Sequence, residues 1–288
     1  MNTKPLVIYH ANCTDGFCAA WVAHKALEDG TEYLPAQYGD PIPSADKLLG
    51  RSVFILDFSW KRPQLEEMAK HAGHITILDH HKTAEADLKG IEAELPDVQC
   101  IFDMGRSGAR LAWDYWFGGR TIVPWPVLYA EDRDLWRWKL DDSKEINAVL
   151  RSYPQDFKAW DGLEGAYQSS TYWRELLIGG CAILRDQQRT IAEAVKNAVE
   201  IEEYGNKVLI VNATSNISEI AGELAKGRPF GVCYFVRYLG EGNGVECVIS
   251  LRSEEGKGVD VSEIAKKHGG GGHRHAAAYT VKARLSEP

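Results

Sequence analysis

The segment Leu6–Leu27, LVIYHANCTDGFCAAWVAHKAL, decides how the first part of the chain folds. Its opening apolar run has the length of a short buried strand, and its second half has the apolar spacing of a helix. Between the two stand polar or reactive side chains: His10, Asn12, Cys13 and Asp15. This turn is either an ordinary strand-to-helix connection or part of a metal site, and the rest of the sequence bears on the choice.

Strand-like and helix-like segments alternate through the first half of the chain. Strands are expected at Pro5–Tyr9, Ser52–Phe58, His74–Leu78 and Val98–Phe102. Helices are expected at Gly16–Leu27, Arg62–His71, Ser107–Phe117 and Trp125–Trp138, and Asp141–Gly165 is polar with weak periodicity. This alternation predicts an α/β fold with a mainly parallel sheet flanked by helices.

The second half of the chain predicts a connector and a smaller α/β domain. The stretch from about Tyr172 to Glu203 contains no proline and has helical character throughout. After Gly205, strands are expected at Val208–Val211, Gly231–Tyr238, Glu246–Leu251 and Ala276–Lys282, with helices at Ser218–Ala225 and Val261–Lys267. We therefore predict a first domain at residues 1–172, a helical linker at 173–204 and a second domain at 205–288.

Composition narrows the class of protein. The 288 residues exceed the usual domain size of ~100–150, so two domains are expected. No apolar run reaches the ~18 residues of a membrane span, which predicts a cytoplasmic protein without a membrane partner. The 6 cysteines form no CxxC pair, so reduced thiols are expected rather than a disulfide framework or a zinc ribbon. The net charge of −8 argues against a long duplex nucleic acid partner, whereas a small anionic substrate is compatible with it.

Carboxylate and imidazole groups follow the expected strands of the first domain. Ligands bind beyond the C-terminal strand ends of parallel sheets, and these ends carry His10, Asp15, Asp57 and His80; Asp132 adds a further carboxylate from a helix. Aspartate and histidine bind Mn²⁺, and two such ions ~3.5–4 Å apart can activate water for displacement at phosphorus. An isolated strand-end aspartate is commonly a turn or helix-cap residue, but the joint occurrence favours a metal site.

The tripeptide Asp79-His80-His81 follows a strand and is the most specific local signal in this half of the chain. Asp79 either caps the next helix or orients an imidazole. In the second case, one histidine would bind metal and the other would face the substrate.

A different chemistry is expected near the C-terminus, in the segment HGGGGHRHAAAY, His268–Tyr279. Glycines let backbone amides approach a phosphate closely, although glycine runs are also common in flexible turns. Small alanines after the run permit close packing of this loop against a neighbour. Upstream, Arg252 ends an expected strand and could bind a phosphate or carboxylate in bidentate fashion.

These segments together resemble the DHH/DHHA1 phosphoesterase family. The resemblance rests on an HxxxxDG motif at His10–Gly16, ILDF around Asp57, DHH at Asp79–His81, YAEDRDLW, SLRS at Ser250–Ser253 and VDVSEIAKKHGGGGHRHAAAY at Val259–Tyr279, and so covers nearly the whole chain. It implies a two-domain hydrolase with a DHH catalytic domain and a DHHA1 substrate-binding domain. Two Mn²⁺ ions, with Mg²⁺ or Co²⁺ as alternatives, would act in the cleft between the domains.

Individual roles are also implied by the resemblance. The implied metal ligands are His10, Asp15, Asp57, His80 and Asp132, with Asp57 as the bridge. His81 would contact the scissile phosphate or assist the leaving group, and the implied substrate-binding residues are Arg252, Gly271, Gly272, His273 and, as a weaker candidate, His275.

The glycine-rich loop is similar to that of the nanoRNase branch of the family. It implies a small phosphorylated substrate: a short oligonucleotide, a dinucleotide or 3′-phosphoadenosine 5′-phosphate. A cyclic-dinucleotide phosphodiesterase, an exopolyphosphatase-like hydrolase, a nucleotide sensor without turnover and a homodimeric state are left open.

Two positions depart from the family pattern. Cys13 stands where the first aspartate of a DxD motif is expected, and because Mn²⁺ prefers oxygen and nitrogen we expect this thiol to pack outside the ligand set. Asn12 could offer a carbonyl oxygen instead. Asp132 and Asp134 lie two residues apart, so only one of them should face the metals if the segment is helical.

Overall fold

The computed structural model describes residues 4–27, 29–118, 122–165, 169–240 and 244–283. The chain divides into two compact units, Met1–Leu184 and Arg185–Pro288. The domain boundaries 1–172, 173–204 and 205–288 stay a prediction. Among the described residues, no helix combines the length and the apolar character needed to cross a membrane.

A parallel sheet forms the centre of the first unit, as the α/β pattern predicts. Its described strands are β1 (Leu6–His10), β2 (Glu32–Ala36), β3 (Ser52–Leu56), β4 (His74–Asp79) and β5 (Val98–Phe102). They lie in the order β2-β1-β3-β4-β5, and every neighbouring pair is parallel. The chain therefore builds outward in one direction from β1 to β2, and in the other direction from β3 to β5.

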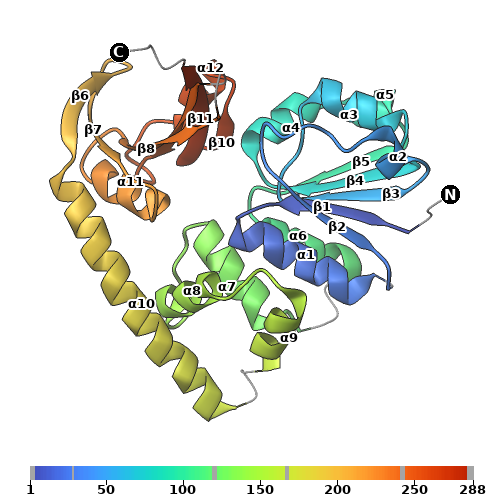
Figure 1. Cartoon of the computed structure of the whole chain (residues 1–288), viewed down its shortest axis with the longest axis horizontal. Helices are drawn as coiled ribbons and strands as arrows, with labels where there is room; N and C mark the ends of the chain where they lie inside the picture. The colour runs from blue at the N-terminus through green and yellow to red at the C-terminus, as the bar shows by residue number, and fades with distance from the viewer. Residues whose placement is uncertain (1–3, 28, 119–121, 166–168, 241–243, 284–288) are drawn as a thin grey trace. The chain divides into compact units, whose positions relative to one another are not determined.

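Helices cover both faces of this sheet (Figure 1). Helices α1 (Thr14–Ala26) and α6 (Gly108–Phe117) lie on one face; α2 (Ala45–Leu48), α3 (Arg62–Ala69), α4 (Lys82–Leu88) and α5 (Ile91–Glu94) lie on the other. A hydrophobic core lies on each face of the sheet, and strand β1 contributes side chains to both. Val7 and Tyr9 pack toward α1, whereas Leu6 and Ile8 pack toward α3. Burial on both faces explains why the central strands β1, β3 and β4 read as apolar runs, whereas the edge strand β2 is partly exposed and does not.

Three further helices pack into the core on the same face as α1 and α6: α7 (Trp125–Asp134), α8 (Ser143–Ser152) and α9 (Phe157–Gly165). The expected helix at Trp125–Trp138 is too long, because Trp136 and Trp138 both have positive φ and interrupt it after Asp134. The weakly periodic stretch 141–165 contains α8 and α9. Helix α8 buries Ile146, Val149 and Leu150, which is helical spacing on an otherwise polar segment.

The helical connector is shorter than the sequence predicts. Helix α10 (Ser170–Lys196) ends seven residues before Glu203, and Val199–Glu203 forms strand β6 instead. Strand β6 pairs antiparallel with β7 (Asn206–Asn212). Tyr204 and Gly205 join them, both at positive φ, as a two-residue hairpin turn requires.

The second unit contains a mixed sheet with a helix on each face. In its described part the strand order is β10-β11-β9-β8-β7-β6, with β8 (Gly231–Tyr238), β9 (Val245–Arg252), β10 (Gly271–His273) and β11 (Ala276–Ala283). Helix α12 (Val261–Lys267) packs on the face that carries Val208 and Val232. Helix α11 (Ile217–Ala225) packs on the face that carries Val211 and Cys233.

A buried arginine links the starts of the first strands in the first unit. Arg51 precedes β3 and is 2% exposed. It donates from Nε to the Lys4 carbonyl at 2.7 Å and from Nη2 to the Pro5 carbonyl at 2.9 Å. It also donates from Nη1 to Glu32 at the start of β2, at 2.8 Å. This guanidinium binds two backbone carbonyls just before β1 and the carboxylate at the start of β2, and so it ties β1 and β2 to β3.

We expect Arg51→Leu to lower the free energy of unfolding of the first unit by about 3 kcal/mol or more, because it removes several hydrogen bonds from a charged donor that contribute about 1.5–3 kcal/mol each. Urea unfolding followed by tryptophan fluorescence measures this unit, since all 9 tryptophans lie within it. The exposed Arg174 provides the control, and Arg174→Leu should change stability by less than about 0.5 kcal/mol. Equal effects of the two substitutions would contradict the prediction.

Candidate metal centre

The C-terminal ends of three neighbouring strands bring polar side chains together. His10 ends β1, Asp57 directly follows β3, and His80 directly follows β4. The Asp57 amide donates to the Leu78 carbonyl at 2.9 Å, which holds the end of β3 against β4. This edge is where the strand order changes direction between β1 and β3, the usual ligand position in open α/β sheets.

Asp57 lies at the middle of this cluster. Its Oδ1 is 3.1 Å from His80 Nε2 and its Oδ2 is 3.4 Å from His10 Nδ1. The residue is 1% exposed and has a φ of 63°, a conformation that costs a non-glycine residue about 1 kcal/mol or more. Burial raises the pKa of Asp57, but the His10 and His80 imidazoles hold it well below its ordinary value. Its carboxylate therefore stays ionised between two nitrogen ligands.

Asp15 is fixed by the first turn of α6. Its carboxylate accepts from the amides of Gly108 at 2.5 Å and Ala109 at 3.1 Å, and Oδ2 lies 3.9 Å from His80 Nε2. A Cβ at Gly108 would meet Asp57 Cβ at 2.5 Å and Asp15 Oδ2 at 2.9 Å, so only glycine fits there. Sequence reasoning missed this contribution, although Ser-Gly at the start of an expected helix is a cap signal that could have indicated it.

Asp134, and not the predicted Asp132, lies in the cluster. Asp134 Oδ2 is 3.4 Å from His80 Nε2. Asp132 instead accepts from the amides of Lys139, at 2.9 and 3.0 Å, and Leu140, at 3.3 Å. The placement of Asp132 at the metals is therefore corrected: side chains two residues apart on α7 point in different directions, and that of Asp132 shapes the loop that follows the helix.

Two groups of possible metal ligands result within the described residues of the first unit. One consists of His10, Cys13 and Asp57 and the other of Asp15, His80 and Asp134, and within each group the ligand atoms lie within 4.8 Å of one another. The short Asp57–His80 contact joins the groups. Imidazole and carboxylate donors suit Mn²⁺, Mg²⁺ and related ions, so this donor set fits a pair of divalent cations.

The charges in this cluster also favour a cation. Burial, followed by repulsion from Asp57 and Asp134, raises the pKa of Asp15 well above its ordinary value. Burial lowers the pKa of His80, but the surrounding carboxylates, first Asp134, raise it to about 10. Oδ2 of Asp57 and Oδ2 of Asp134 are buried and accept no hydrogen bond from any described residue. A divalent ion would satisfy these oxygens and remove the repulsion between the carboxylates.

Asp79 orients an imidazole, which was one of the two roles expected from the sequence. Its Oδ1 lies 2.7 Å from His81 Nδ1, and it accepts from the amides of His80 and His81 at 2.7 and 3.2 Å. Burial lowers the pKa of His81, but the neighbouring Asp79 carboxylate raises it above its ordinary value. Because Nδ1 faces Asp79, Nε2 is the nitrogen of His81 that would reach a substrate.

The predicted substrate-binding residues come together at one edge of the second unit. Arg252 on β9 pairs with Ala276 on β11, and β10, which contains Gly271, Gly272 and His273, pairs with the same strand. Arg252 donates to Ser218 Oγ at 2.7 Å, and His275 Nδ1 lies 3.0 Å from Ser253 Oγ.

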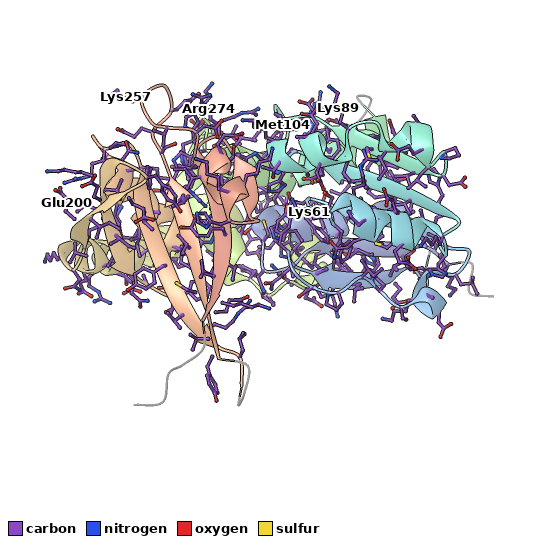
Figure 2. The ribbon with its side chains drawn as sticks, turned by 90° about the horizontal axis from the view of Figure 1, so that it is seen from above. Lys61, Lys89, Met104, Glu200, Lys257 and Arg274 are labelled. Atoms are coloured by element: carbon purple, nitrogen blue, oxygen red, sulfur yellow. The ribbon has the colours of Figure 1, made fainter. Side chains whose placement is uncertain are left out.

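Close packing explains the glycines and alanines of this edge. Gly272 has a φ of 138°, and a Cβ there would lie 2.4 Å from the Ala276 carbonyl oxygen. The alanines that follow the glycines therefore pack directly against them where β10 pairs with β11. Arg274, in the turn between β10 and β11, points toward solvent with its side chain 63% exposed (Figure 2).

Comparison with known proteins adds to this geometry. Residues 205–287 match the model of the DHHA1 domain. The chain is 29% identical over 296 residues to the uncharacterized protein R106 of Acanthamoeba polyphaga mimivirus, covering 94% of this chain and 66% of that protein. It is 26% identical over 236 residues to the oligoribonuclease NrnB of Bacillus subtilis, covering 78% of this chain and 57% of that protein. The chain thus spans slightly less than two thirds of the first relative and little more than half of the second.

Among solved structures, the pGpG-specific phosphodiesterase PggH from Vibrio cholerae aligns with a TM-score of 0.49 at 13% identity, covering 97% of this chain and 94% of that chain. The first unit thus carries a cluster of candidate metal ligands on a parallel sheet, and the second unit carries the matched DHHA1 domain. The second unit carries a DHHA1 domain, and the chain is similar in sequence to proteins of the DHH/DHHA1 phosphoesterase family.

Asp134→Ala and Asp132→Ala form a matched pair that tests the cluster. We expect Asp134→Ala to weaken Mn²⁺ binding by about tenfold or more, because even loss of an outer-shell partner costs about 10- to 100-fold. Asp132→Ala should lower the free energy of unfolding by about 2–4 kcal/mol, because the Lys139 and Leu140 amides lose their acceptor. Calorimetric Mn²⁺ titration and urea unfolding of both variants measure these effects. If Asp132→Ala lost Mn²⁺ binding and Asp134→Ala lost stability instead, the placement of Asp134 in the cluster would be contradicted.

Proposed function

We propose that this protein is a divalent-metal-dependent phosphoesterase that hydrolyses phosphate ester bonds of short oligonucleotides, dinucleotides or 3′-phosphoadenosine 5′-phosphate. The observation that carries the proposal is the pair of ligand groups joined through Asp57 and His80. Mn²⁺ is the proposed ion, with Mg²⁺ and Co²⁺ as alternatives. The sequence similarity to a protein named as an oligoribonuclease supports a short oligonucleotide as substrate.

The residues divide the work of hydrolysis. Two bound divalent ions would supply Lewis acidity at the phosphoryl oxygens and lower the pKa of an attacking water. Asp57 and His80 hold the two ligand groups in contact, and the α6 amides keep Asp15 pointing at His80. His81, oriented by Asp79, would present Nε2 to the leaving oxygen and give it a proton.

The second unit supplies groups suited to phosphate recognition. The Arg252 guanidinium can bind a phosphate in bidentate fashion, and the backbone amides of Gly271 and Gly272 can approach one closely. His273 and His275 extend the same edge and add imidazole donors. We propose that these groups hold a second phosphate or the base of the substrate.

Activity assays on one substrate panel test the function. With Mn²⁺, Asp57→Asn and His80→Ala should each lower kcat/KM on linear dinucleotides by about 100-fold or more, since both remove a proposed metal ligand. Asp46→Asn changes an exposed aspartate on α2 and should keep full activity. Metal-stimulated hydrolysis that survives both changes would overturn the proposal. A preference for cyclic dinucleotides or polyphosphate would mean that the proposed substrate class is wrong. Nucleotide binding without turnover would indicate a sensor.

Tyr38 is a candidate platform for a nucleobase beside the cluster. Its ring centroid lies 5.4 Å from that of His10 and 5.9 Å from that of His81. The residue is 54% exposed, whereas the neighbouring Phe58 is fully buried. An exposed aromatic ring next to the proposed catalytic groups can stack on a base.

We expect Tyr38→Ala to raise KM for a dinucleotide by about tenfold, because stacking of one base contributes about 1–3 kcal/mol. KM for the corresponding abasic dinucleotide should change little, and Tyr38→Phe should keep the normal KM for both substrates because it keeps the ring. Steady-state kinetics on the two substrates measures the difference. An equal rise in KM for both would mean that Tyr38 does not bind the base.

A further inference from the structure

Cys13 lies inside one of the two ligand groups. It is the residue directly before α1, with extended backbone angles of −113° and 134°. Its Sγ atom, one nitrogen of His10 and one carboxylate oxygen of Asp57 all lie within 4.8 Å of one another. The thiol therefore lies beside the cluster, within reach of a metal ion held by His10 and Asp57.

A second observation points to a ligand at the same place. Asp57 is 1% exposed, and its Oδ2 accepts no hydrogen bond from any described residue. Nδ1 of His10 is also buried without a hydrogen bond among the described residues, at 3.4 Å from that oxygen. Unsatisfied buried polar atoms are rare, because each costs about 1–3 kcal/mol. A cation bound between these atoms would satisfy both of them.

The two groups differ in their donor chemistry. The group of Asp15, His80 and Asp134 offers nitrogen and oxygen only, whereas the group of His10, Cys13 and Asp57 adds sulfur. Thiolate ligands favour Zn²⁺ and Co²⁺ over Mg²⁺ and Mn²⁺. The difference between the groups therefore predicts a difference in the ions they bind.

We propose that the Cys13 thiolate binds a metal ion together with His10 and Asp57, and that this site prefers Zn²⁺ or Co²⁺ whereas the other site takes Mn²⁺ or Mg²⁺. Binding forms a metal–sulfur bond and releases the thiol proton to solvent. The inference rests on the proposed metal centre and deepens it by assigning a different class of ion to each site.

X-ray absorption at the zinc edge tests this on the full-length chain with one equivalent of Zn²⁺. The wild type should show a sulfur neighbour at about 2.3 Å, distinct from nitrogen and oxygen neighbours at about 2.0–2.2 Å. Cys13→Ser should lose that sulfur signal and bind Zn²⁺ about tenfold or more weakly. Serine is a favoured residue at a helix start, so the fold should be kept. Cys181→Ser changes an exposed cysteine and should keep the signal.

Metal selectivity gives a second measurement. Cys13→Asp replaces sulfur with oxygen and should shift the ratio of Zn²⁺ to Mn²⁺ affinity toward Mn²⁺ by about tenfold. A wild-type spectrum without sulfur, a sulfur signal that persists in Cys13→Ser, or an unchanged affinity ratio in Cys13→Asp would each overturn the inference.

The failure of this inference is distinguishable from that of the proposed function. A sulfur neighbour in a protein that hydrolyses no phosphate ester would leave the inference standing and reject the function. Mn²⁺-dependent hydrolysis by a protein whose zinc-edge spectrum shows no sulfur neighbour would support the proposed function and reject the inference about Cys13.

Discussion

The reversal of strand order between β1 and β3 is the constraint on which the first unit depends. Because β1 connects to β2 on one side and β3 connects to β4 on the other, helices α1 and α3 cover opposite faces of the sheet. The strand ends at the reversal therefore stay open to a ligand. Asp57 occupies this position at a φ of 63° between two imidazoles, and the other proposed ligands are arranged around it.

Electrostatics then links the stability of this edge to a bound cation. Asp15, Asp57 and Asp134 place three carboxylates around His80 in a largely buried cluster. Burial and repulsion from Asp57 and Asp134 raise the pKa of Asp15 well above its ordinary value, which shows the cost of this arrangement. The α6 amides offset part of the cost for Asp15. Asp57 Oδ2 and Asp134 Oδ2 each lie 3.4 Å from an imidazole nitrogen but accept no hydrogen bond from a described residue. The same oxygens that cost stability in the free protein are those that would bind metal.

Hydrophobic patterns in the sequence predicted the features that depend on neighbouring residues alone. The central strands are buried on both faces and read as apolar runs, so they and the polar residues that follow them could be predicted, namely His10, Asp15, Asp57 and His80. The partly exposed edge strand β2 could not be predicted in this way. Contacts distant in sequence decided the rest. Asp132 turns away because amides seven and eight residues later bind it, and Gly108 contributes because α6 returns to Asp15. The sequence predicts helix over Val199–Glu203, because only the pairing of this segment with β7 makes it a strand.

At the start of α1, the stability of the helix and the chemistry of the side chain at position 13 have separate causes. The position before α1 normally favours serine, threonine, aspartate or asparagine, whose side chains accept a backbone amide of the first turn. Cys13 makes no such capping hydrogen bond, so the stability of the helix gives no reason for a cysteine here. Gly16 holds the same turn against His10, because a Cβ there would meet the His10 carbonyl oxygen at 2.3 Å. The backbone therefore fixes the position of residue 13, and at the proposed metal site the sulfur atom would decide which metal ions bind there.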